Sequence, residues 1–193
     1  MKQIFGLIFL LSCSYNVFSQ NESGVVVYDW EVAKNASVDT VFGISFEKYK
    51  LESLPDELRN FIHLQVLDLQ KNKLKELPDY IKTFEELKEI NAEKNLLEYF
   101  PVQICSLTKL THLRLGRNYF ENLPDCIGNV STLEYMDFYD TPIRELPQSL
   151  DRLKNLKEID FTGIKFSPSF QKSWTARLPK VKVIFDAPCD CLE

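Results

Sequence analysis

The chain has 193 residues and a mass of 22.5 kDa, which suits one domain or one short repeat array. Hydrophobic residues make up 45% and charged residues 26%, so the composition is that of a folded globular protein rather than a disordered or fibrous one. The formal charge of −5 argues against a nucleic-acid partner, and the six glycines form no phosphate-binding motif.

The first twenty residues have the layout of a secretory signal. Lys2 supplies a positive start, Ile4–Leu11 is a short apolar run, and a polar stretch leads to the small residue Ser19. The run is too short to span a bilayer as a helix. We expect cleavage after Ser19, which would leave a secreted or periplasmic protein.

A second interpretation of the same segment involves a lipid anchor. Leu10–Cys13 resembles the cleavage box of a bacterial lipoprotein, in which Cys13 would be lipidated and become the new N-terminus. The signal would then be unusually short. Either processing route takes the mature protein out of the cytoplasm.

A 23-residue period runs through the middle of the chain. In five consecutive blocks, positions 1, 4, 8, 11, 14, 17 and 19 are apolar and position 5 is proline, while position 22 is asparagine in the first three. Such a period indicates a solenoid, in which each unit buries its apolar face against the next. The blocks are Leu51–Lys73, Leu74–Leu96, Leu97–Tyr119, Phe120–Pro142 and Ile143–Lys165.

Within each block, positions 14, 17 and 19 fit a short strand, and the proline suits the first position of a helical turn. The pattern LxxLPxxIxxLxxLxxLxLxxN resembles the 23-residue leucine-rich repeat of plant Ras-group-related and bacterial exported proteins, from Val41 to about Phe185. The resemblance implies a right-handed α/β horseshoe with about seven short parallel strands on the concave face and short helices or turns on the convex face. The asparagines should bond the backbone of adjacent repeats.

The pattern changes at the N-terminal end of the array. A short helix is expected over Asp29–Asn35, with Trp30 and Ala33 facing the core, and Val41, Ile44 and Phe46 predict the first strand. The expected organisation is a signal peptide over 1–19, a cap and first strand over 20–50, five repeats over 51–165, and a capping repeat with a tail over 166–193.

The C-terminal end should be closed by a longer helix. Ser167 can cap it with Pro168 at its first position, and Phe170 and Trp174 would share one face. Leu178, Val181 and Val183 then match positions 14, 17 and 19, which predicts a last strand 22 residues after its predecessor.

Four cysteines remain after cleavage at Ser19, and an even number in an exported chain allows disulfides. Cys105 and Cys126 lie at positions 9 and 7 of neighbouring repeats, near each other but poorly matched in register. Cys105 is therefore interpreted as unpaired and half-buried. Cys189 and Cys191 are too close in sequence to pair without strain.

No catalytic arrangement is apparent in the sequence. GxSxG and HExxH are both absent. His63 and His112 fall on opposite faces of the predicted solenoid and Cys105 lies across its body from His112, so neither a shared metal nor a Cys–His pair is expected. The sequence predicts no enzyme, no cofactor and no metal.

Strand alternation sends positions 16, 18 and 20 to the concave surface. One cluster there is rich in tyrosine and arginine, the residue types enriched at binding hot spots. We call it the concave patch; it comprises His112, Arg114, Arg117, Tyr135, Asp137, Tyr139 and Asp160.

Two other interpretations of the concave patch stay open. Arg114 could simply pair with Asp137 across the strands, with the tyrosines in contact with solvent. Alternatively, Asp137 and Asp160 could share a divalent cation, although hard cations need about six oxygens and few others are at hand.

The sequence therefore predicts a non-enzymatic exported module that binds another protein through its concave face. No nucleic acid is expected as a partner, and a membrane only if Cys13 is lipidated. The alternative is a structural or adhesive envelope component that binds glycan or surface polymer through Tyr135 and Tyr139.

Overall fold

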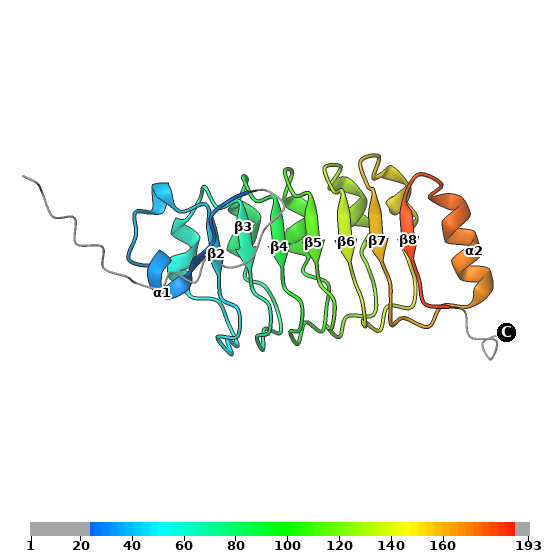
Figure 1. Cartoon of the computed structure of the whole chain (residues 1–193), viewed down its shortest axis with the longest axis horizontal. Coiled ribbons are helices and arrows are strands. Elements are labelled where there is room, and N and C mark those ends of the chain that lie inside the picture. The colour runs from blue at the N-terminus through cyan, green and yellow to red at the C-terminus, as the bar shows by residue number, and fades with distance from the viewer. Residues whose placement is uncertain (1–23, 188–193) are drawn as a thin grey trace, which may run out of the picture.

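The computed structural model describes residues 24–187. They form one curved sheet of eight parallel strands that follow each other in chain order (Figure 1). The strands are β1 (Tyr28–Asp29), β2 (Gly43–Ser45), β3 (Val66–Asp68), β4 (Glu89–Asn91), β5 (His112–Arg114), β6 (Tyr135–Asp137), β7 (Glu158–Asp160) and β8 (Lys182–Ile184). The predicted repeat solenoid is confirmed.

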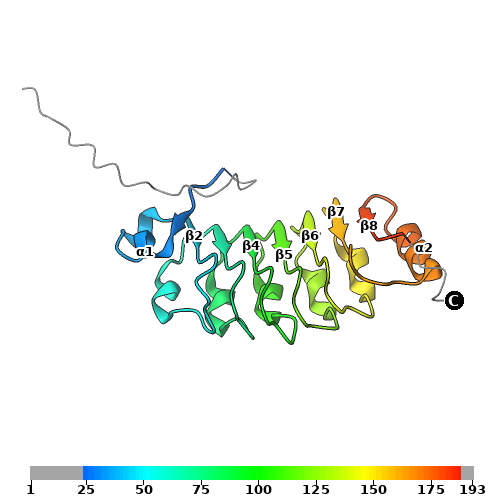
Figure 2. The same cartoon turned by 60° about the horizontal axis from the view of Figure 1, so that its bottom comes forward.

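Short 3₁₀ turns line the face opposite the strands (Figure 2). The five repeat prolines each lie one residue before a turn, in extended backbone, rather than at the first helical position as predicted. The carbonyl of Pro55, for example, accepts the Leu58 N–H at 3.2 Å. Because the proline precedes the turn, its missing N–H costs the turn no hydrogen bond. The repeat turns are Asp56–Asn60, Asp79–Thr83, Val102–Ser106, Asp125–Asn129 and Gln148–Arg152.

The apolar positions of the repeat form one continuous core between the strands and the turns. Leu58, Leu64 and Leu67 of the first repeat are fully buried, as are their equivalents in the next two repeats. Their burial removes apolar surface from water and is the main stabilising contribution of each repeat.

The asparagines at position 22 bond the backbone of two adjacent repeats, as predicted. Asn95 is buried; its Nδ2 donates to the carbonyls of Leu69 and Ala92 at 2.9 and 3.0 Å, and its Oδ1 accepts the Leu74 N–H at 3.0 Å. In the fourth repeat Thr141 donates to the Phe138 carbonyl at 2.6 Å, so that repeat keeps part of this bonding.

The residue before each asparagine position has left-handed backbone, which the sequence did not indicate. Lys71, Lys94, Arg117 and Asp140 all have φ between 54° and 59°. Each donates its N–H to a carbonyl of the next repeat, as Lys94 does to Gly116 at 2.9 Å. These bonds offset the steric cost of the left-handed region for a residue with a side chain.

At the N-terminal end, α1 (Trp30–Ala33) covers the core as expected, and Trp30 stacks near Phe46 with a centroid separation of 4.9 Å. The sequence did not predict β1, which pairs with β2 through Tyr28 and Asp29. Asp29 also caps α1 by accepting the Glu31 N–H at 2.9 Å, so one residue ends the strand and begins the helix.

At the C-terminal end, α2 (Pro168–Arg177) begins at the predicted Ser167 cap, and the rings of Phe170 and Trp174 lie 6.3 Å apart. The predicted register of the last strand is wrong. Lys182 pairs with Glu158, so this repeat is two residues longer than predicted.

The longer last repeat has an evident packing reason. Phe185, rather than Val183, takes the place that follows Phe138 and Phe161, and its ring stacks on Phe161 at 5.7 Å. The stacking of these aromatic rings thus fixes the register of β8. The apolar spacing of Leu178 and Val181 had predicted a different register.

The interpretation of Cys105 as unpaired is also wrong. Cys105 and Cys126 form a disulfide across a Cα–Cα distance of 5.6 Å. The two 3₁₀ turns that carry them pack side by side, which compensates for the difference of two positions in the repeat. Cys13, Cys189, Cys191 and the predicted signal peptide lie outside the described residues.

Candidate binding surface on the concave sheet

Position 18 of the repeat has a structural task that the sequence analysis did not recognise. The Oδ1 of Asp68, Asn91, Asp137 and Asp160 accepts the N–H of the residue two positions later, at 2.7–3.1 Å. These bonds shape the chain as it leaves the strand. One oxygen of Asp137 and one of Asp160 therefore bond the backbone, which leaves one oxygen of each carboxylate for contact with a ligand.

The third repeat departs from this scheme. Arg114 stands at position 18, and a guanidinium has no acceptor with which to bond the following N–H. The residue two positions later is Gly116, and a Cβ at Gly116 would overlap the ring of Tyr139 from the next repeat. The opening expected beside Gly116 is thus occupied by the Tyr139 ring.

Tyr135, the first residue of β6, also leans toward β5. Its ring stacks on His112 with a centroid separation of 4.6 Å and an interplanar angle of 16°. His112 is only 8% exposed, and its Nδ1 lies 2.9 Å from the Thr111 hydroxyl. In this geometry His112 supports Tyr135 from below rather than offering a free imidazole to a ligand.

Opposite charges lie between the two tyrosines. Arg114 is directly opposite Asp137, and Asp137 is directly opposite Asp160. The pKa of Asp137 is raised to about 6, chiefly by burial and also by the nearby carboxylates of Glu93 and Asp160, while the Tyr139 N–H and the Arg114 charge oppose the shift. Arg114 therefore only partly compensates the acidic surroundings of Asp137.

Arg117 lies at the margin of the patch. Its Nε is 2.9 Å from a carboxylate oxygen of Asp140, and its guanidinium lies 5.8 Å from the centre of the Tyr139 ring. It therefore borders Tyr139 on the side away from the sheet centre. The structure thus brings all seven predicted residues to one region of β5, β6 and β7.

A shallow depression of about 190 Å³ marks the centre of this region. Its polar lining comes from three adjacent strands and comprises His112, Arg114, Tyr135, Asp137, Glu158 and Asp160. The mixture of aromatic, cationic and anionic groups can recognise a polar segment of a macromolecule.

The described residues offer no support for a metal in the patch. Among residues 24–187, no three His, Cys, Asp or Glu side chains converge in a way that could hold an ion. Asp160 instead accepts both the N–H and the hydroxyl of Thr162. A membrane-spanning helix is likewise not found in this part of the chain.

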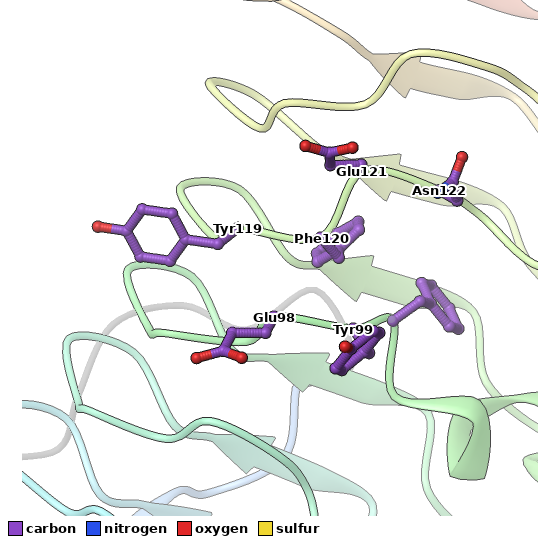
Figure 3. Close-up of a pocket in the computed structure, with 7 residues that line it drawn as sticks. Glu98, Tyr99, Tyr119, Phe120, Glu121 and Asn122 are labelled. Atoms are coloured by element: carbon purple, nitrogen blue, oxygen red, sulfur yellow. The ribbon is translucent and has the colours of Figure 1, made fainter.

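A second depression lies on the flank of the solenoid, in the loops that follow β4 and β5 (Figure 3). It has a volume of about 310 Å³, and we call it the flank pocket; it is lined by Glu98, Tyr99, Phe100, Tyr119, Phe120, Glu121 and Asn122. The flank pocket was not predicted from the sequence, because the candidate binding positions were taken from the strands alone. The signal was present: a tyrosine stands at two loop positions where the other repeats carry mainly polar residues.

Comparison with known proteins agrees with the repeat pattern. The family model described as Leucine Rich Repeat matches residues 63–84. No curated protein matches the chain.

Solved structures with the same fold come from bacteria. A leucine-rich-repeat protein of Leptospira interrogans superposes with a TM-score of 0.59 at 23% identity, over 77% of this chain and 43% of that one. Internalin C2 of Listeria monocytogenes superposes with a TM-score of 0.63 at 18% identity, over 79% of this chain and 64% of that one. This chain thus spans less than two thirds of the length of either. Its repeat, its parallel sheet and these likenesses together show the leucine-rich-repeat fold.

Proposed function

We propose that this protein is an exported, non-enzymatic module that binds another protein through the concave patch. The leucine-rich-repeat fold is commonly used for protein interaction, which supports the general class. Fold alone does not identify a binding site, so the support for the concave patch comes from its residues.

The observation that carries the proposal is the departure of the third repeat from the scaffold. The side chain at position 18 of the neighbouring repeats accepts a backbone N–H, whereas the Arg114 guanidinium cannot. Gly116, two residues later, has no side chain. The missing side chain at Gly116 leaves the space that the Tyr139 ring of the next repeat occupies. A scaffold requirement does not explain this combination, but a recognition surface does, since tyrosine and arginine dominate binding hot spots.

Charge favours a protein partner with cationic groups at the point of contact. Asp137 and Asp160 lie side by side, and Glu158 lines the same depression. Arg114 is the only arginine or lysine among the residues that line it. Glu158 is already paired with Lys182 at 3.0 Å, so a partner's lysine or arginine would chiefly relieve the repulsion between Asp137 and Asp160.

Export is proposed from the signal-like segment over residues 1–19. The disulfide between Cys105 and Cys126 supports it, because such bonds persist mainly in oxidising compartments. Secretion or release into the periplasm after Ser19 is the first proposal, and an envelope anchor through Cys13 is the second.

Binding of a glycan or surface polymer is the second candidate function. The observation that favours it is the pair of tyrosine rings in the concave patch, because Tyr135 is stacked on His112, Tyr139 fills the space beside Gly116, and both could stack on sugar rings. The charged pair between them is better suited to a polypeptide.

Affinity capture from the envelope and medium of the producing cell tests both candidates. The protein would be compared with the folded triple variant Tyr135→Ala/Tyr139→Ala/Arg114→Glu, and with Ile62→Ala as a control at an exposed residue that lines neither depression. We expect a protein, identified by mass spectrometry, that the native chain and Ile62→Ala retain and the triple variant loses. Retention of a polysaccharide instead would favour the second candidate, and equal capture by all three would contradict the concave patch.

A further inference from the structure

The flank pocket holds the two most exposed large hydrophobic side chains among the described residues. Tyr99 is 81% exposed and Tyr119 is 61% exposed. They lie in two adjacent loops, at the two ends of the block Leu97–Tyr119, and in Figure 3 the Tyr119 ring extends away from the backbone. The neighbouring Phe100 and Phe120 are buried and pack against each other with a centroid separation of 5.9 Å. The pocket therefore has an apolar floor and two exposed rings at its rim.

The repeat itself does not require tyrosine at either place. The positions equivalent to Tyr99 carry Ser53, Glu76, Asn122 and Glu145, and those equivalent to Tyr119 carry Lys73, Leu96, Pro142 and Lys165. All these residues build the same loop. Aromatic side chains in two adjacent loops are thus an addition to the scaffold, and exposed aromatic clusters mark interaction sites.

The flank pocket also carries a carboxylate that has no partner among residues 24–187. Glu121 is paired with Arg144 at 2.8 Å, but Glu98 makes no ion pair or side-chain hydrogen bond with any residue between 24 and 187. In Figure 3 the Glu98 carboxylate extends to the same outer side as Tyr119. A pocket lined by a carboxylate and two exposed aromatic rings is a favourable place for a cation.

Elsewhere the molecule satisfies such rings with its own cations. Four aromatic rings lie 5.1–5.8 Å from an arginine or lysine head group of the same chain; they are Tyr80, Tyr135, Tyr139 and Trp174. Within residues 24–187, neither Tyr99 nor Tyr119 has such a partner. Their faces are therefore open to a cation from another molecule.

We propose that the flank pocket binds a lysine or arginine side chain of a partner polypeptide. The aliphatic stem would lie between Tyr99 and Tyr119, and the cationic head would approach Glu98. Charge complementarity selects this occupant, because an apolar segment would leave the Glu98 carboxylate beside a dehydrated surface. This site is separate from the concave patch and does not depend on it.

A lysine-containing peptide tests the proposal directly. The intact protein, labelled at its tyrosine rings for NMR, would be titrated with an acetylated and amidated Gly-Gly-Lys-Gly-Gly peptide. The matched probe carries norleucine in place of lysine, which keeps the stem and removes the charge. We expect the lysine peptide to shift the Tyr99 and Tyr119 resonances saturably and the norleucine peptide to leave them unchanged.

Variants then identify the groups responsible. Tyr99→Ala and Glu98→Gln should each weaken the lysine peptide by about two- to fivefold, while Tyr99→Phe, which keeps the ring face, should bind normally. Glu52→Gln, at the same repeat position as Glu98, is the charge control and should have no effect. Tyr135→Ala/Tyr139→Ala should also leave binding unchanged, because the concave patch is a different site.

Three results would overturn the proposal. Equal shifts with norleucine would mean that the pocket recognises only apolar groups. Shifts of Tyr135 and Tyr139 without shifts of the flank tyrosines would assign the cation to the concave patch. Unsaturable shifts, or binding insensitive to both Glu98→Gln and Tyr99→Ala, would mean that the flank pocket is not a site.

Discussion

The ring of Tyr139 occupies the space that a side chain on Gly116 would fill. The two residues belong to adjacent repeats, so the absence of a side chain in one determines where an aromatic ring of the next can lie. Arg114 precedes Gly116 and is directly opposite Asp137, which accepts the Tyr139 N–H at 2.9 Å. Four residues of two repeats thus determine the form of the concave patch together.

Replacing Gly116 by alanine should separate binding from folding. The new methyl group would overlap the Tyr139 ring, which is a side chain that can turn away. We expect partner affinity to fall by about tenfold, as for displacement of a hot-spot residue, while the free energy of unfolding changes by less than about 1 kcal/mol. Titration calorimetry with the captured partner and urea unfolding measure the two quantities.

Gly128→Ala is the matched control for this substitution. A methyl group there would overlap the backbone carbonyl of Ser149 in the next convex turn, which cannot move independently. We expect a loss of stability of about 2 kcal/mol or more, with normal affinity in the folded fraction. A large loss of stability in Gly116→Ala with unchanged affinity would contradict the role assigned to Tyr139.

The asparagines at position 22 should be costly to remove. Asn95→Ala would leave the Leu69 and Ala92 carbonyls and the Leu74 N–H without their buried partner, so we expect unfolding to become easier by about 3 kcal/mol. Thr141→Ala, at the equivalent position with one bond to the Phe138 carbonyl, should cost about 1 kcal/mol. Equal costs in urea unfolding would show that the asparagines do not stabilise the array through these bonds.

Asp137 predicts a particular dependence of stability on pH. Its pKa is raised from an ordinary 3.8 to about 6 in the folded chain, so the folded state binds more protons than the unfolded state between these values. Stability due to this group therefore falls as the pH rises through that window. Asn keeps the oxygen that accepts the Tyr139 N–H but carries no charge.

Asp137→Asn should accordingly stabilise the protein at pH 7 and remove this part of the pH dependence. The expected gain is about 1 kcal/mol, because solvent reaches the carboxyl and reduces the full value of the shift. Thermal unfolding between pH 4 and pH 7 measures it. Destabilisation by Asp137→Asn at pH 7 would mean that the attraction of Arg114 outweighs the burial of the carboxylate.

The disulfide should contribute to stability through the unfolded chain. Cys105 and Cys126 are 21 residues apart, and closing a loop of that size is worth about 3 kcal/mol. The double variant Cys105→Ala/Cys126→Ala should therefore unfold at a lower urea concentration and still form the solenoid. Alkylation of both cysteines in the native protein without a reducing agent would contradict the bond itself.

The repeat pattern predicted what depends on period alone. Leu67 and Asn95 could be placed from the sequence because every repeat presents the same environment to the same position. The hydrogen-bonding role of the asparagines followed for the same reason.

Features that depend on contacts between unlike parts of the chain could not be predicted. The register of β8 depends on Phe185 stacking on Phe161, and the disulfide depends on how two convex turns pack. In the concave patch, the sequence indicated the residues but not that His112 lies beneath Tyr135. Nor did it indicate that Asp137 and Asp160 each bond the backbone of their own repeat.

The most direct test of the account is site-specific photocrosslinking from the concave patch. A photoreactive benzoylphenylalanine would replace Tyr139 in one sample and Ile62, which is 54% exposed on the convex side, in another. The account predicts a discrete crosslinked protein from position 139 in the producing cell's envelope or medium and none from position 62. A crosslink from position 62 with none from position 139 would contradict binding through the concave face.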